Sequence, residues 1–245
     1  MRLFFLKPGQ AICVWSLALL TCCAYASSED VDVSATVAWA NSSKAAKRHT
    51  TRDVVAWLTP ISPATPVAVP ARSGLQLVQR NKSFDPHLLV IPVGSVVQFP
   101  NRDPFFHNVF SLFEGKRFDL GLYEAGSTRN VHFDKPGVSF IFCNIHSEMS
   151  AVIIALATPY YSTSDSQGKI LIPHVPIGRY RLHLWYEAAL PEELEAQSRD
   201  VVVSAETASL GTLRLKLADL PKTHANKYGK EYEPPAPGNP AYIQP

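Results

Sequence analysis

The chain has 245 residues, of which 23 are lysine or arginine, 21 are aspartate or glutamate and 46% are hydrophobic. Residues 1–26 contain two basic side chains, Arg2 and Lys7, and no acidic one, so removing them leaves 21 charges of each sign. A formally neutral chain argues against a protein that binds nucleic acid or polyanions over its whole surface, because such proteins carry a basic excess.

The N-terminal 26 residues have the three parts of a secretory signal peptide. Arg2 and Lys7 give the positive start, residues 11–23 are apolar, and Ala24-Tyr25-Ala26 matches an A-x-A cleavage site. An uncleaved anchor is the alternative, but the apolar stretch is short for a bilayer span. A second alternative is a lipoprotein attached through Cys22, but threonine at position 21 fits a lipoprotein cleavage site poorly. We expect export to the periplasm, with no membrane span after cleavage.

The first block, residues 27–157, is dominated by short β-rich runs between turn residues, and no long helical periodicity interrupts them. This pattern is typical of sandwiches or barrels. The expected strands are Val31–Trp39, Val54–Leu58, Leu88–Ile91, Ser95–Phe99, His107–Leu112, Asn130–Phe133, Val138–Phe142 and Ala151–Leu156. The basic segment 41–52 has two interpretations, a docking patch for an acidic partner or a solvated loop, and the loop is favoured.

A second block, residues 158–217, continues the β pattern without cysteine or methionine. Asp165 and Gly168 mark a type I turn, and Pro191 can begin one helical turn. The expected strands are Lys169–Ile172, Tyr180–Trp185, Val201–Val203 and Thr212–Leu217. Residues 218–245 are polar with recurring proline, which predicts a disordered tail whose tyrosines Tyr228, Tyr232 and Tyr242 could anchor it to a surface.

After the leader, the chain keeps one cysteine and one methionine, and they lie in a single short run from Cys143 to Met149. His146 lies between them and His107 lies upstream. Exported proteins usually pair their cysteines, so a lone one indicates intermolecular pairing, a reactive thiol, an inert core position or metal ligation. Two imidazoles, one thiolate and a weak thioether are the ligands of a blue-copper site, which favours ligation.

These motifs resemble a known family. His107-Asn108-Val109 followed by Cys143-x2-His146-x2-Met149 resembles the plastocyanin/amicyanin class of cupredoxins, and the loop spacing is closer to amicyanin. The segment from Phe84-Asp85-Pro86 to Asp103 also resembles bacterial periplasmic methylamine utilisation proteins. The resemblance covers roughly residues 79–156. It implies an all-β Greek-key sandwich with one type 1 copper ion, held by His107, Cys143 and His146 equatorially and by Met149 axially.

The same resemblance implies roles for residues around the ligands. Phe105, Phe106 and Ile145 would form an apolar collar for redox partner proteins, although core positions are the alternative for the phenylalanines. Asn108 would help to tie the two ligand segments together. Beside Met149, Glu148 is either a solvated carboxylate, which is favoured, or a neighbour that alters the site. His132 is interpreted as an ordinary surface histidine.

The second block resembles carboxypeptidase-regulatory or transthyretin-like sandwiches, through Asp165-x-x-Gly168, Pro176-x-Gly178-x-Tyr180 and the Leu182–Trp185 strand. Such domains have no catalytic machinery, and fold analogy does not transfer function. The whole sequence contains no G-x-S-x-G, no H-E-x-x-H and no His-x-His pair, so no enzyme is predicted. We expect a one-electron carrier; a copper chaperone or store and a non-enzymatic envelope scaffold are the alternatives.

Overall fold

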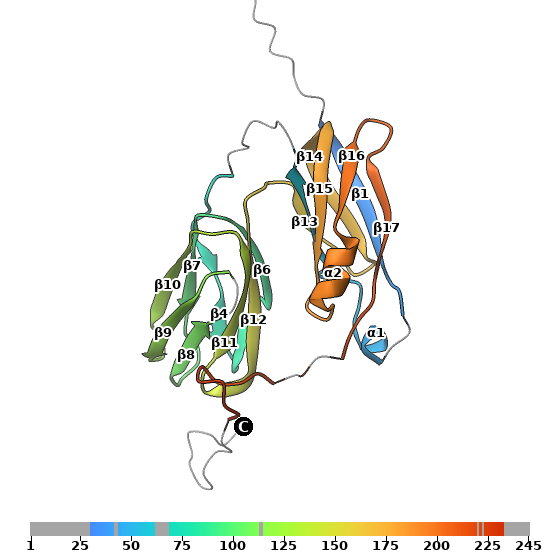
Figure 1. Cartoon of the computed structure of the whole chain (residues 1–245). Helices are drawn as coiled ribbons and strands as arrows, with labels where there is room; N and C mark the ends of the chain where they lie inside the picture. The colour runs from blue at the N-terminus through green and yellow to red at the C-terminus, as the bar shows by residue number, and fades with distance from the viewer. Residues whose placement is uncertain are drawn as a thin grey trace, which may run out of the picture.

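The computed structural model describes residues 30–41, 44–61, 69–112, 115–219, 221 and 223–232 (Figure 1). The expected leader, residues 1–26, lies outside this part of the chain. The described residues form an all-β protein of two β-sandwiches, as predicted, with two short helices among them. Neither helix of these described residues has the length and hydrophobicity of a transmembrane segment.

The split sandwich, as we call residues 30–61 with 158–217, is built from two distant parts of the chain. One of its sheets has the order β14-β1-β17 and the other the order β13-β2-β15-β16. The strands are β1 (Asp30–Trp39), β2 (Val55–Pro60), β13 (Tyr161–Thr163), β14 (Lys169–Pro176), β15 (Gly178–Trp185), β16 (Arg199–Val203) and β17 (Ser209–Leu215).

This pairing corrects the domain boundaries predicted above. β1 pairs antiparallel with β14 and parallel with β17, whereas β2 pairs with β13 and β15. The expected first domain of residues 27–157 is therefore wrong at its N-terminal end, because its first two strands complete the second sandwich. Their alternate apolar side chains, such as Val33, Val37 and Leu58, are buried in that sandwich's core.

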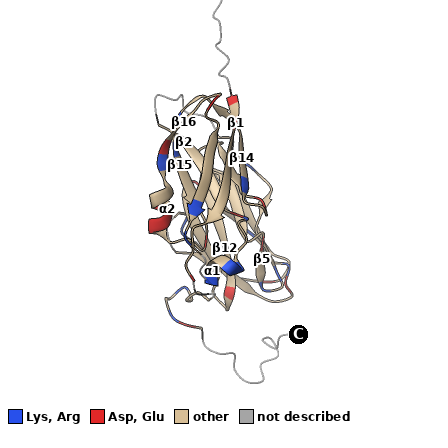
Figure 2. Cartoon of the chain, turned by 90° about the vertical axis from the view of Figure 1, so that its right-hand side faces the viewer, with Lys and Arg blue, Asp and Glu red and all other residues tan. Residues whose placement is uncertain are grey.

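Turns and short helices connect the strands of the split sandwich. The predicted turn at Asp165 is confirmed: the Gly168 N–H donates to the Asp165 carbonyl, and Gly168 has a φ of +77°. Part of the basic segment 41–52 is a helix, α1 (Lys44–Arg48), where a loop was expected. Pro191 begins α2 (Pro191–Gln197), as predicted. Figure 2 marks basic residues of α1 in blue and acidic residues of α2 in red.

The inserted sandwich, as we call residues 69–157, lies between the two parts of the split sandwich in sequence. It has a five-stranded sheet of order β6-β12-β11-β8-β9, a three-stranded sheet of order β10-β7-β3 and the two-stranded β4-β5. The strands are β3 (Leu75–Gln76), β4 (Val78–Arg80), β5 (Ser83–Asp85), β6 (Leu88–Pro92), β7 (Ser95–Pro100), β8 (His107–Ser111), β9 (Phe118–Tyr123), β10 (Thr128–Phe133), β11 (Gly137–Cys143) and β12 (His146–Leu156).

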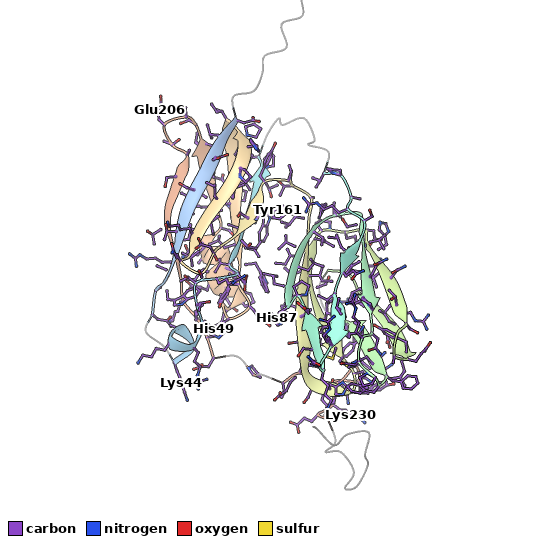
Figure 3. All side chains as sticks on the ribbon, turned by 180° about the vertical axis from the view of Figure 1, so that it is seen from behind. Lys44, His49, His87, Tyr161, Glu206 and Lys230 are labelled. Atoms are coloured by element: carbon purple, nitrogen blue, oxygen red, sulfur yellow. The ribbon has the colours of Figure 1, made fainter. Side chains whose placement is uncertain are left out.

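Both faces of the five-stranded sheet contribute buried apolar side chains, and the two faces belong to different clusters. Its inner face, with Ile141, Cys143 and Ile153, packs in the core of the inserted sandwich. Val152 and Ile154, which alternate with Ile153 along β12, belong to a separate cluster with Trp185 of the split sandwich. His87, labelled in Figure 3 on the side of the inserted sandwich that faces the split sandwich, adds a polar contact. Its Nε2 lies 2.6 Å from Oε2 of Glu187. The two sandwiches therefore share an apolar interface.

Candidate metal centre

His107, Cys143 and His146 converge on one point of the inserted sandwich. The Cys143 Sγ atom lies 3.5 Å from Nδ1 of His107 and 3.5 Å from Nδ1 of His146. One ligand atom from each of the three residues lies within 4.8 Å of the others. The side chain of His107 is fully buried, Cys143 is a buried free thiol, and His146 is partly buried. The three equatorial ligands predicted from sequence are therefore brought together.

Strand pairing explains why these residues meet. His107 begins β8, Cys143 ends β11 and His146 begins β12. β11 pairs with β8, with Cys143 opposite Val109, and with β12, with Cys143 opposite His146. The two residues between Cys143 and His146 form the turn of a hairpin, so both side chains lie near the start of β8, where His107 is. The sheet thus fixes the separation of the three donors before any metal binds.

Met149 lies three residues after His146 on β12 and is 1% exposed. It belongs to the same buried cluster as Cys143. Alternation along the strand turns its side chain into the core, unlike exposed Glu148 beside it. Its burial next to the ligand loop is compatible with the axial role implied by the family resemblance, which stays a prediction.

Asp103 supports His107 from the side opposite Cys143. Oδ2 of Asp103 lies 2.8 Å from Nε2 of His107. Asp103 is only 4% exposed. The same carboxylate accepts hydrogen bonds from the backbone N–H groups of Asn81 and Lys82, at 2.6 and 3.0 Å. Because the carboxylate holds the proton on Nε2, Nδ1 of His107 is left free as a donor to a metal. Sequence reasoning quoted Asp103 only within the family resemblance and assigned it no role.

A left-handed turn aims these two N–H groups at Asp103. Asn81 and Lys82 connect β4 to β5 and have φ values of 54° and 55°, as a type I′ hairpin turn requires. Asparagine is one of the few non-glycine residues that tolerates this region. The carboxylate therefore has three donors around it, and all three are fixed by the backbone or by a buried ring.

Burial sets the protonation states of the donor atoms. Desolvation lowers the pKa of His107, although the Asp103 carboxylate acts in the opposite direction. Desolvation, followed by the charge of His107, lowers the pKa of His146 to about 4. Burial raises the pKa of the Cys143 thiol, against backbone N–H groups of Ile145, Asn108 and His146 that lower it. The imidazoles are thus neutral near pH 7 and available as ligands, whereas the thiol needs a cation beside it to lose its proton.

Asn108 ties the ligand segments together through its backbone. Its carbonyl accepts the Asn144 N–H at 2.9 Å, which joins β8 to the turn that follows Cys143. The Asn108 side chain points elsewhere, and its Nδ2 donates to Asp119 Oδ1 at 2.7 Å. The predicted tie exists, but any residue type at position 108 could provide the carbonyl that makes it.

The expected apolar collar is present in part. The Phe105 ring centroid lies 5.3 Å from that of His107 and 5.8 Å from that of His146. Phe106 is 51% exposed, whereas Ile145 is partly buried against the core. His132 is exposed and hydrogen-bonded to the Gly94 carbonyl, away from the donor cluster, as an ordinary surface histidine would be.

The C-terminal segment does not form a free tail over its described residues. Residues 223–232 contact the turn between Cys143 and Ser147, through Tyr232 among others. The expectation of a disordered tail is wrong for these residues, whereas the suggestion that Tyr232 anchors the segment is confirmed. Residues 233–245, including Tyr242, lie outside the described part of the chain.

The donor set fits copper better than other common metals. Two nitrogen donors and one thiolate with a nearby thioether form the blue-copper set, in which the thioether is a weak ligand. Structural zinc sites usually have four strong ligands. Magnesium and calcium need oxygen ligands. In the described part of the chain, the donor cluster of His107, Cys143 and His146 includes no carboxylate.

Comparisons with known proteins found no family model and no curated relative that matches this chain. Among solved structures, it is similar to a purple cupredoxin from Nitrosopumilus maritimus (24% identity, 34% of this chain and 99% of that one, TM-score 0.31). A copper-containing nitrite reductase from Thermus scotoductus is 29% identical over 40% of this chain and 27% of that one, with a TM-score of 0.33. A Cu(I) mutant of amicyanin is 18% identical over 41% and 98%, with a TM-score of 0.32. Such low TM-scores do not establish a family, so the function proposed below rests on the geometry of the site.

Proposed function

We propose that this protein is an exported copper protein that carries single electrons between redox partner proteins and catalyses no reaction itself. The observation that supports the proposal is the convergence of His107, Cys143 and His146, with Cys143 Sγ at 3.5 Å from both Nδ1 atoms. A bound copper ion would supply the one-electron chemistry by alternating between Cu(I) and Cu(II).

The chain's own residues prepare the site for such a metal. His107 and His146 present neutral Nδ1 atoms, and Asp103 keeps the proton of His107 on Nε2. Cys143 would bind as a thiolate, and Met149 would be the weak axial ligand. Because the sheet already fixes the three donors, the protein resists a change of geometry when the oxidation state changes, which favours fast electron transfer.

The unequal burial of the ligands supports electron entry on one side of the site. His107 and Cys143 are fully buried, whereas His146 is only partly buried and Phe105 lies against its ring. A partner protein would therefore approach the His146 side, where exposed Phe106 offers apolar contact area. Export depends on residues 1–26, which have the composition of a signal peptide.

The test is direct: the purified protein is loaded with Cu(II) and its visible spectrum is recorded. We expect an intense blue or purple thiolate-to-copper band that Cys143→Ser abolishes, and a reversible redox wave with little metal loss in either state. A colourless product, or a band that survives Cys143→Ser, would reject the proposal. Rapid loss of copper from one oxidation state would favour a copper chaperone or store instead.

A further inference from the structure

Residues 223–232, which we call the C-terminal strap, fold into a compact turn of their own. Asn226 Oδ1 accepts the N–H groups of Tyr228 and Lys230, at 2.9 and 3.1 Å. The Asn226 N–H donates to the Lys230 carbonyl, and the Gly229 N–H donates to the Asn226 carbonyl, both at 2.8 Å. Gly229 has a φ of +73°, a conformation that favours glycine. The strap therefore has a defined shape that its own sequence dictates.

The strap lies across the turn that carries the metal ligands (Figure 1). Three hydrogen bonds join the strap to successive parts of this turn. They run from the Tyr232 hydroxyl to the Cys143 carbonyl (2.7 Å), from the Lys227 N–H to Asn144 Oδ1 (2.9 Å) and from the His224 N–H to the Ser147 carbonyl (3.1 Å). One of them thus ends on the backbone of the thiolate ligand itself.

The strap also covers apolar side chains behind the ligands. Phe110 on β8 and Phe142 on β11 each adjoin a core residue, Val109 and Cys143, so they point to the outer face of the sheet. Even so, Phe110 is only 1% exposed. The His224 ring centroid lies 4.2 Å from that of Phe142 and 6.3 Å from that of Phe110. The strap therefore shields the part of this face nearest the ligand turn.

An ion pair links the strap to β9, the strand that pairs with β8. Lys227 Nζ lies 2.8 Å from Asp119 Oδ2. The other oxygen of this carboxylate, Oδ1, accepts a hydrogen bond from Nδ2 of Asn108, the residue that follows His107 in the sequence. Both charged side chains are partly exposed, so this pair adds little to stability. Its geometric effect is to connect the strap with β9 and, through the hydrogen bond between Asp119 and Asn108, with β8.

We propose that the C-terminal strap holds the metal-ligand turn in its binding geometry, and that Tyr232 is the positioning residue that fixes Cys143. A ligand turn between two strands can open by rotating its backbone, and a hydrogen bond on the Cys143 carbonyl opposes this rotation. The strap thereby keeps the thiol covered before a metal binds and slows metal loss afterwards. The second effect rests on the copper function proposed above, but the first does not.

The first experiment uses the metal-free full chain and measures how fast a thiol reagent labels Cys143, read on the peptide that contains it. Tyr232→Phe keeps the ring but removes the hydroxyl that bonds to Cys143. Tyr228→Phe is the matched control, because Tyr228 lies on the same strap and is 73% exposed. We expect about fivefold faster labelling in Tyr232→Phe, because the free energy of one typical hydrogen bond corresponds to about a fivefold change in the population of the open turn. The rate in Tyr228→Phe should be unchanged.

A chain that ends at Pro221 removes the whole strap and uncovers Phe110 and Phe142. We expect labelling faster by on the order of a hundredfold, since burial of one large apolar side chain has that value. Should this shortened chain fail to fold, the Tyr232→Phe and Tyr228→Phe pair decides alone. Labelling of Tyr232→Phe at the wild-type rate would overturn the proposal.

The second experiment uses the copper-loaded protein and measures the rate of Cu(I) loss to a chelator, the thiolate-to-copper band and the thermal midpoint. We expect about fivefold faster loss and a shifted band in Tyr232→Phe, with a thermal midpoint close to that of Tyr228→Phe. A general loss of stability without any change in the band would contradict a positioning role. If no variant binds copper, the proposed function fails, whereas the labelling rates still judge the strap.

Discussion

The carboxylate of Asp103 offers the sharpest test of how the protein shapes its metal site. Asp103→Asn preserves the size of the side chain but replaces one acceptor oxygen with an NH2 donor. Three donors face this side chain, from Asn81, Lys82 and Nε2 of His107. An amide oxygen can accept from some of them, but its NH2 group must meet at least one other donor. One buried hydrogen bond is therefore lost and replaced by a repulsive contact.

Two magnitudes follow from this geometry. An unsatisfied buried donor costs about 1–3 kcal/mol of folding free energy, and Asp103 is only 4% exposed, so water cannot compensate. Loss of a carboxylate behind a ligating histidine weakens metal affinity by roughly tenfold to a hundredfold. We expect both effects in Asp103→Asn, because the same side chain holds the β4-β5 turn and orients the ring of His107.

The assay is a competition titration of Cu(II) against a chelator of known affinity, together with denaturant unfolding of the metal-free protein. Asp134→Asn is the control, since Asp134 is a half-exposed carboxylate of the same sandwich that pairs with Lys116. The control should bind copper like the wild type. Wild-type copper affinity in Asp103→Asn would refute the assignment of Asp103 as the group that orients His107.

Three further predictions concern the axial ligand and the interface between the sandwiches. Met149→Leu should cost less than about 1.5 kcal/mol, because the swap preserves volume, yet it should change the copper spectrum and raise or lower the reduction potential; an unchanged spectrum would exclude Met149 as a ligand. The hydrogen bond that the His87 ring donates to the Glu187 carboxylate raises the pKa of His87 above 6.5. This half-exposed pair should therefore add less than about 1 kcal/mol of stability below the unfolded-state pKa, and that stability should be lost as the pH rises through the raised pKa of the folded state. Glu187→Gln should flatten that pH dependence in urea unfolding, and an identical profile would contradict it. Trp185→Ala should cost about 3 kcal/mol and separate the unfolding of the two sandwiches in calorimetry. A single transition at the wild-type temperature would show that Trp185 does not couple the two sandwiches.

The three donors could be predicted from sequence because cysteine and methionine are rare in this chain and their spacing to His146 is short. Asp103 could not, since carboxylates are common and its role depends on a loop that folds back beside His107. The short strands β3, β4, β5, β9 and β13 were also missed. β9 contains Asp119 and Gly121, which weaken any strand pattern, and its pairing with β8 is what orders it.

The domain boundary failed for a different physical reason. β1 and β2 have clear strand patterns, and both were predicted as strands. A pattern of alternating apolar residues shows which face is buried, but it does not show which strand pairs at the edge. Here β1 joins β14 and β17, which lie far along the chain. The strap was missed because its composition is polar, and its order comes from the Asn226 turn and from Tyr232.

The position of β12 connects the metal centre to the rest of the molecule. Its first residue is the ligand His146, and further along, Val152 and Ile154 pack against the split sandwich. The outer face of the same sheet is covered near the ligands by the strap, which follows the split sandwich in sequence. Both covers therefore come from outside residues 69–157, so a fragment with those residues alone would expose Phe110 and the outer side chains of β12. The split sandwich thus contributes to the candidate metal centre by covering the outer side chains of β12, although it contains none of the three donors.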